Sequence, residues 1–214
     1  MTTLSGQRRP PRSGGAPSSL VVLLHGYGAD ATDLIGLADV LGRAVPGAEF
    51  VSPNAPGFTP HGGREWFPLS ATRDPSDYVR GVQSAGPQLQ DYLTAELERT
   101  GLTESDMALV GFSQGTMMTL HAAYRRDRPI AAVVGFSGLH AEEGDAPVHP
   151  CPTLLVHGTS DQVLPVQMTL AASQTLNAIN VPVQWHLRPG LAHGIDEVGL
   201  AYAADHLARY LPRN

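Results

Sequence analysis

The stretch MALVGFSQGTMM, residues 107–118, joins an apolar run to a helical pattern through one serine between two glycines. The apolar part is typical of a buried strand, and the residues from Ser113 onward are typical of a helix. Glycine at Gly111 and Gly115 would let strand and helix approach closely around a serine at the tip. Because Gly-x-Ser-x-Gly strings also occur by chance, the surrounding sequence must decide whether Ser113 is a nucleophile.

Short apolar runs alternate with helical patterns on both sides of this stretch. Strands are predicted at 19–26, 48–53, 107–112, 130–138, 152–158 and 181–187, and helices at 33–42, 78–101, 113–127, 165–179 and 196–211. This alternation predicts a single α/β domain over 19–214, with a mostly parallel central sheet flanked by helices. Residues 1–18, rich in Pro, Gly, Ser and Arg, are expected to form a flexible leader. The Pro- and Gly-rich segment 54–80 is expected to be a long irregular loop with a function.

Composition excludes several classes of function. All 14 basic residues are arginine, so Schiff-base chemistry, a pyridoxal phosphate anchor and a Walker lysine are excluded. A formal charge of −6 offers no electrostatic footprint for nucleic acid. The single cysteine, Cys151, is expected to be a buried, inert thiol. With no apolar run long enough for a membrane span and no signal-peptide pattern, a soluble cytoplasmic protein is predicted.

Chemistry in a parallel α/β sheet collects where the strands end. Asp161 follows the strand at 152–158, and His193 follows the strand at 181–187, in loops of small residues. The order Ser113, Asp161, His193 is the order used by α/β hydrolases. A serine hydroxyl needs a base in contact with it, and that histidine needs a carboxylate to fix its tautomer. These three residues are the predicted catalytic set.

Four other residues compete for these roles and are less well placed. Ser137 lies in GFSGL, where the glycine comes one residue too early for the same turn. Asp145 could replace Asp161 from the preceding loop, His186 falls inside a strand pattern, and His25 is expected to be a hydrogen-bonded turn residue. The nine histidines show no metal-ligand spacing, so neither a metal site nor a cofactor is expected.

A serine hydrolase also needs N–H groups for the oxyanion. The residue after the nucleophile, Gln114, is one expected backbone donor. The Gly-rich loop HGYGAD, residues 25–30, follows an early strand and is expected to supply the second donor from the Tyr27 N–H. A plain glycine-rich turn is the alternative interpretation of this loop.

Six segments of the chain belong together: LLHGYGADATDLIGLA, SPNAPG, GREWFPL, GFSQGTMM, LLVHGTSDQVLPV and GLAHGID. With these segments the chain resembles the phospholipase/carboxylesterase family of α/β hydrolases over about residues 20–210. The resemblance implies an α/β-hydrolase fold with little or no lid, and a triad of Ser113, His193 and Asp161. It further implies an oxyanion hole from the backbone of Tyr27 and Gln114, and a possible homodimer.

The predicted reaction is hydrolysis of a carboxylic ester with a short-to-medium acyl chain, through an acyl-enzyme intermediate. Acyl thioester and lysophospholipid hydrolysis stay open, as do, with less support, acyl transfer and ligand binding without catalysis. The substrate would be a small-molecule ester or thioester. Side chains that could form an acyl wall, or plug a loop onto the core instead, are Phe58, Trp66, Phe67, Leu69 and Leu164.

Overall fold

The protein is built on one seven-stranded sheet, described here from a computed structural model that covers residues 4–70, 74–141 and 149–212. The strand order is β1-β3-β2-β6-β7-β8-β9, and every neighbouring pair except β1 and β3 is parallel. The strands are β1 Gly6–Arg9, β2 Ser19–Leu24, β3 Ala48–Pro53, β6 Met107–Phe112, β7 Ala132–Phe136, β8 Thr153–Gly158 and β9 Val183–Arg188. The mostly parallel sheet predicted from the sequence is therefore confirmed.

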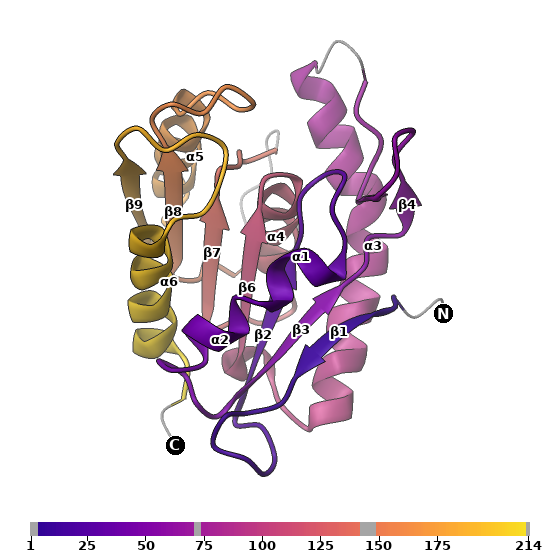
Figure 1. Ribbon diagram of the computed structural model, residues 1–214, viewed down its shortest axis with the longest axis vertical. Coiled ribbons are helices and arrows are strands. Elements are labelled where there is room, and N and C mark those ends of the chain that lie inside the picture. The colour runs from indigo at the N-terminus through magenta and orange to yellow at the C-terminus, as the bar shows by residue number, and fades with distance from the viewer. Residues whose placement is uncertain (1–3, 71–73, 142–148, 213–214) are drawn as a thin grey trace.

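Helices cover both faces of the sheet, as Figure 1 shows, with α1, α2 and α6 on the near side. These are α1 Ala31–Ile35, α2 Ala38–Leu41 and α6 Glu197–Tyr210, and they share one apolar cluster with alternate residues of the central strands. The opposite cluster is formed with α3 Pro75–Thr100, α4 Gln114–Tyr124 and α5 Gln167–Ala178. Because both faces are covered, β2, β3, β7 and β8 are buried along their whole length, which explains the largely apolar sequences of β2, β7 and β8.

The segment predicted as one long loop, 54–80, is more regular than expected. Residues Gly57–Phe58 and Arg64–Glu65 form a two-stranded ribbon, β4 and β5, and α3 already begins at Pro75. Proline suits the first turn of a helix because its missing N–H is not needed there, and the Asp74 side chain accepts from the Ser76 N–H as the N-cap. The prolines that suggested an irregular loop thus include one that starts a helix.

The expected flexible leader over 1–18 is corrected for its described part. Residues Gly6–Arg9 form β1, which pairs antiparallel with β3 at the edge of the sheet. Leu4 and Pro11 on either side of it are buried. The polar composition that suggested disorder is that of an edge strand whose side chains face solvent and charged partners.

An ion-pair network holds β1 against α3. The Glu96 carboxylate is almost fully buried and accepts from Arg8 Nη1 at 2.6 Å and from Arg99 Nε at 2.9 Å. Arg99 also donates to Glu49 Oε1 at 2.7 Å. Burial alone would raise the pKa of Glu96, but the bonds from Arg8 and Arg99 outweigh it and hold that pKa below its ordinary value.

Replacing Arg8 with methionine keeps the aliphatic part of the side chain and removes the guanidinium that donates to the Glu96 carboxylate. We expect the free energy of unfolding at pH 7 to fall by about 1 kcal/mol, less than the ~1.5–3 kcal/mol of a hydrogen bond to a charged group, because Arg8 is partly exposed. Since folding lowers the Glu96 pKa, the contribution is present above the ordinary glutamate pKa of about 4.3 and is lost as the pH falls below it. Urea unfolding of wild type and Arg8→Met at pH 7 and pH 3 measures this.

Arg9→Met is the matched control, because the side chain of Arg9 bonds only the Arg8 carbonyl among the described residues. Its free energy of unfolding should stay within about 0.5 kcal/mol of wild type. Equal losses in the two variants would contradict the role given to the Arg8–Glu96 pair.

Candidate active site

Ser113 lies at a strained turn between β6 and α4. Its backbone has φ 55° and ψ −117°, a combination that is costly for any residue other than glycine. The two flanking glycines permit it: a Cβ at Gly111 would lie 2.4 Å from the Gly115 carbonyl oxygen, and one at Gly115 would lie 1.8 Å from the Leu24 carbonyl oxygen. No larger residue fits at either position, so the predicted strand–turn–helix arrangement around Ser113 is confirmed as geometry.

Hydrogen bonds to the neighbouring strand hold this turn. The Ser113 N–H donates to the Phe136 carbonyl at 2.9 Å, at the end of β7. The Thr116 hydroxyl lies 2.8 Å from both the Phe136 and the Gly111 carbonyl oxygens. The strain at Ser113 is therefore offset by bonds that the rest of the sheet supplies.

Asp161 and His193 meet beyond the ends of β8 and β9. His193 Nδ1 lies 2.7 Å from Asp161 Oδ2, and the other carboxylate oxygen accepts the N–H groups of Val163 at 2.8 Å and Leu164 at 2.9 Å. The Asp161 side chain is fully buried. Burial raises the pKa of this carboxyl, but the bonds from His193, Leu164 and Val163 outweigh burial and leave the pKa below its ordinary value.

A second histidine, not predicted from the sequence, lies beside the same carboxylate. His157, at the end of β8, has Nε2 3.1 Å from Asp161 Oδ2 and is fully buried. The one signal in the sequence is its position four residues before Asp161 at a strand end.

Ser113 and His193 line a common cavity of about 270 Å³. The apolar part of its wall includes Leu69 and Leu164, as expected, and several residues not singled out from the sequence: Tyr78, Phe112, Met117 and Val163. The Phe112 and His193 rings lie 4.9 Å apart between centroids, so the histidine packs against the strand that carries the serine. The arrangement places a hydroxyl, an imidazole and an apolar wall around one small space.

Both expected oxyanion donors, Tyr27 and Gln114, line this cavity. Gln114 is the first residue of α4, where backbone N–H groups have no partner within the helix. The loop of Tyr27 is fixed by His25, whose Nδ1 lies 2.8 Å from the Gly26 carbonyl and whose Nε2 accepts the Ala55 N–H at 3.1 Å. Burial lowers the pKa of His25, so the ring stays neutral and serves as the hydrogen-bonded turn residue predicted from the sequence.

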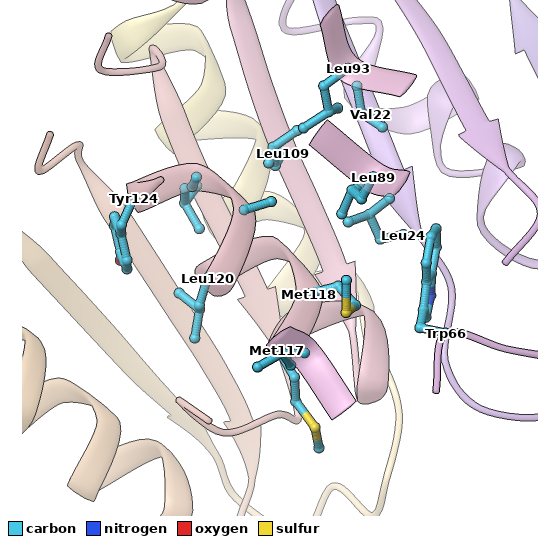
Figure 2. Close-up of a cluster of buried hydrophobic side chains, with 14 of the residues drawn as sticks. Val22, Leu24, Trp66, Leu89, Leu93, Leu109, Met117, Met118, Leu120 and Tyr124 are labelled. Atoms are coloured by element: carbon cyan, nitrogen blue, oxygen red, sulfur yellow. The ribbon is translucent and has the colours of Figure 1, made fainter. Parts of the chain in front are cut away.

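The aromatic residues of the predicted acyl wall lie elsewhere. Trp66 is 4% exposed, donates from Nε1 to the His25 carbonyl at 2.9 Å, and packs in the core cluster shown in Figure 2. Phe67 is buried in the same cluster, whereas Phe58 is 68% exposed and stacks under the Arg64 guanidinium. None of the three lines the cavity, so the predicted wall is corrected to its aliphatic members, Leu69 and Leu164. Trp66 and Phe67 plug the loop onto the core, which was the alternative interpretation.

The side chain of Gln114 holds that aromatic segment in place. Its Oε1 accepts the Trp66 N–H at 2.9 Å and its Nε2 donates to the Phe67 carbonyl at 2.8 Å. One residue thus lines the cavity and clamps the loop beside it through its side chain.

Ser137 and His186 do not line the cavity that Ser113 and His193 share. Ser137 is buried and its hydroxyl lies 3.4 Å from the Gly194 carbonyl. His186, on β9, stacks on Tyr202 of α6. Asp145 lies outside the described residues. Cys151 is buried, and burial raises the pKa of its thiol to about 12.

Within the described ranges, no group of three or more His, Cys, Asp or Glu side chains is arranged to hold a metal ion. In the same part of the chain, no helix is both long and apolar enough to cross a membrane.

Comparison with known proteins agrees with this geometry. The family model for phospholipase/carboxylesterase matches residues 12–211, nearly the whole chain. The chain belongs to the phospholipase/carboxylesterase family. It is a hydrolase of the carboxylesterase type, and the α/β-hydrolase fold expected from the resemblance is confirmed.

Individual relatives are esterases and thioesterases. The chain is 26% identical over 198 residues to esterase YpfH of Escherichia coli, covering 91% of this chain and 84% of that protein. It is 25% identical over 173 residues to acyl-protein thioesterase 1 of Schizosaccharomyces pombe, covering 75% and 76%. Among solved structures, esterase PE8 superposes with a TM-score of 0.93 at 39% identity, covering 98% of this chain and all of that one.

Replacing Gln114 with alanine tests the clamp. The variant leaves the Trp66 N–H and the Phe67 carbonyl buried without their partner, so we expect the free energy of unfolding to fall by about 2 kcal/mol or more. Urea unfolding followed by tryptophan fluorescence measures the loss, and the emission of Trp66 should shift to the red as water reaches the loop. Gln184→Ala, at an exposed position on β9, is the control and should unfold like wild type. A wild-type midpoint for Gln114→Ala would show that the clamp contributes nothing.

Proposed function

We propose that the protein hydrolyses carboxylic esters of short-to-medium acyl chains, with Ser113 as nucleophile, His193 as base and Asp161 as the group that orients the base. The observation that carries the proposal is the strained Ser113, which opens into the same small cavity as a histidine bonded to a buried carboxylate. A backbone held in this conformation by its surroundings is common at functional sites.

In the proposed reaction His193 accepts the proton of the Ser113 hydroxyl as the oxygen attacks the ester carbonyl. Asp161 accepts the N–H of His193 Nδ1, so Nε2 is the nitrogen left to act as base. The low pKa of Asp161 keeps the carboxylate ionised at neutral pH, where it stabilises the imidazolium that forms. His193 then gives the proton to the leaving alcohol, and water releases the acid from Ser113.

The N–H groups of Tyr27 and Gln114 are proposed to bind the oxyanion of the tetrahedral intermediate. The two residues line the cavity from different elements, the loop after β2 and the N-terminus of α4, which Trp66 links through its bonds to Gln114 and His25. Fixed donors cost no reorganisation when charge develops, and one such donor typically contributes about 10²–10³ in rate.

The substrate class follows from the wall of the cavity. Tyr78, Met117, Leu69 and Leu164 present apolar surface beside Ser113, and a cavity of about 270 Å³ suits a short-to-medium acyl chain. Acyl thioesters are the second candidate, because relatives of this chain include acyl-protein thioesterase 1 of two yeasts.

Ser113→Ala should abolish turnover of p-nitrophenyl esters from acetate to palmitate. The hydroxyl that forms the acyl-enzyme is lost while the fold is kept, so we expect kcat to fall by about 10⁴-fold or more for every chain length that wild type hydrolyses. Rates with wild type and variant, at equal thermal midpoints, measure this. Activity surviving in Ser113→Ala would overturn the choice of nucleophile.

The matching acyl-coenzyme A thioesters, run beside the oxoesters with wild type, separate the two candidate substrates. Faster turnover of the thioester at equal chain length would replace the ester proposal with the thioester one. Inactivity on both, in a folded protein, would refute catalysis on esters altogether.

Leu69→Trp should shift the chain-length preference toward acetate. A larger side chain at the wall removes space for methylene groups, each of which contributes about 0.8 kcal/mol of binding, or about fourfold in kcat/KM. The ratio of kcat/KM for hexanoate over acetate measures the effect, and we expect it to fall at least fourfold. Phe58→Ala is the control, because Phe58 lies outside the cavity, and it should leave this ratio unchanged. If Phe58→Ala changed this ratio and Leu69→Trp did not, the acyl wall would be formed by the aromatic residues after all.

A further inference from the structure

The buried ring of His157 bridges the Asp161 carboxylate and helix α5. Its Nε2 lies 2.9 Å from the Leu164 carbonyl oxygen and 3.1 Å from Asp161 Oδ2, and its Nδ1 lies 2.7 Å from the Thr169 hydroxyl. The His157 side chain is completely buried and does not line the cavity of Ser113. The ring therefore has no route to substrate, and any role in the reaction passes through Asp161.

The partners of the ring fix its tautomer. Both neighbours of Nε2 are oxygen atoms that can only accept, a carbonyl and an ionised carboxylate, so Nε2 carries a proton. The neighbour of Nδ1 is the Thr169 hydroxyl, whose single proton has a closer acceptor in Nδ1 at 2.7 Å than in the Gly138 carbonyl oxygen at 3.4 Å. A neutral His157 with its proton on Nε2 thus satisfies both ring nitrogens, which suits a ring with no solvent contact.

We infer that His157 is a positioning residue for the proposed reaction: its Nε2–H holds Asp161 Oδ2 in place beside His193 and takes up part of the carboxylate charge. This inference rests on the proposed function. Oδ2 would then accept the His193 N–H and share the His157 Nε2–H with the Leu164 carbonyl oxygen, while Oδ1 accepts two N–H groups from the backbone. The carboxylate can rotate away from His193 only by giving up these contacts.

Charge sharing gives the arrangement a consequence for pH. Within the described residues, the titratable groups within bonding distance of the Asp161 carboxylate are His157 on β8 and His193 in the loop after β9. The other contacts here are neutral. The Thr169 hydroxyl of α5 contacts the His157 ring, and the Gly138 carbonyl in the loop after β7 contacts that hydroxyl. Without the Nε2–H, more of the negative charge of Asp161 would act on His193. Protonated His193 would then persist to higher pH, and the acid limb of the pH profile of kcat/KM would move to higher pH.

Two amide variants of different reach test the inference. The amide of His157→Gln can bring an N–H near the position of Nε2, whereas that of His157→Asn is one methylene shorter and reaches only the position of Nδ1. We expect His157→Asn to lose about tenfold in kcat, equivalent to about 1.4 kcal/mol, with KM within twofold. Its acid limb should move up by about half a pH unit, and His157→Gln should restore both values toward wild type.

His186→Asn is the matched control for loss of a strand histidine. It lies on the neighbouring β9 and stacks on Tyr202 without touching Asp161, so its kcat and acid limb should equal those of wild type. Thermal midpoints of all variants separate a loss of stability from a loss of function. A wild-type kcat and acid limb in a folded His157→Asn would overturn the inference.

A measurement on wild type keeps the inference testable if His157→Asn does not fold. Nitrogen-15 NMR of labelled histidine should show His157 as a neutral ring protonated at Nε2, with a proton resonance that moves in Asp161→Asn. A ring protonated at Nδ1 instead would refute the bond to Oδ2. This result does not depend on turnover, so it stands apart from the Ser113→Ala test of the proposed function.

Discussion

The close approach of helix α4 to the sheet is the constraint on which the site depends. The backbone of Gly115 lies against the carbonyl end of β2, and that of Gly111 against Gly115 itself, so neither position accepts a side chain. The chain can leave β6 and enter α4 within one residue only by placing Ser113 in a conformation that L-residues rarely adopt. Strain at one serine thus follows from two glycines and a parallel sheet buried on both faces.

The remaining parts of the site are delivered by the order of the strands. β2, β6, β8 and β9 run in the same direction, so the loops that carry Tyr27, Ser113, Asp161 and His193 emerge at the same edge. Each loop is then held by bonds of its own, such as that from Trp66 Nε1 to the His25 carbonyl. Trp66 and Phe67 support the site from the core, and of the residues predicted for the acyl wall Leu69 and Leu164 line the cavity.

Much of this was predictable because the deciding signals are local. The apolar run before Gly111, the glycines around Ser113 and the strand ends before Asp161 and His193 each depend on a few neighbouring residues. The expected leader was wrong in residues 6–9 because its polar composition matches disorder, and only the partner strand and Glu96 show why it pairs. Phe58 and Trp66 were misplaced for the same reason, since composition does not say which way a side chain in a proline-rich loop faces. His157 was missed because its meaning lies in a contact with Asp161 that sequence spacing alone does not reveal.

The surroundings of Asp161 also indicate what the carboxylate does in the proposed reaction. A carboxylate that stored a proton would need a raised pKa, as a buried acid without donors has. The N–H groups of His193, Leu164 and Val163 outweigh the effect of burial here and lower the pKa of Asp161 instead. Its chemistry is therefore that of a permanent acceptor, which fixes the orientation of His193 and leaves the proton on the imidazole. A second histidine on the same oxygen is consistent with that role, because a group that only accepts gains rigidity from every donor that reaches it.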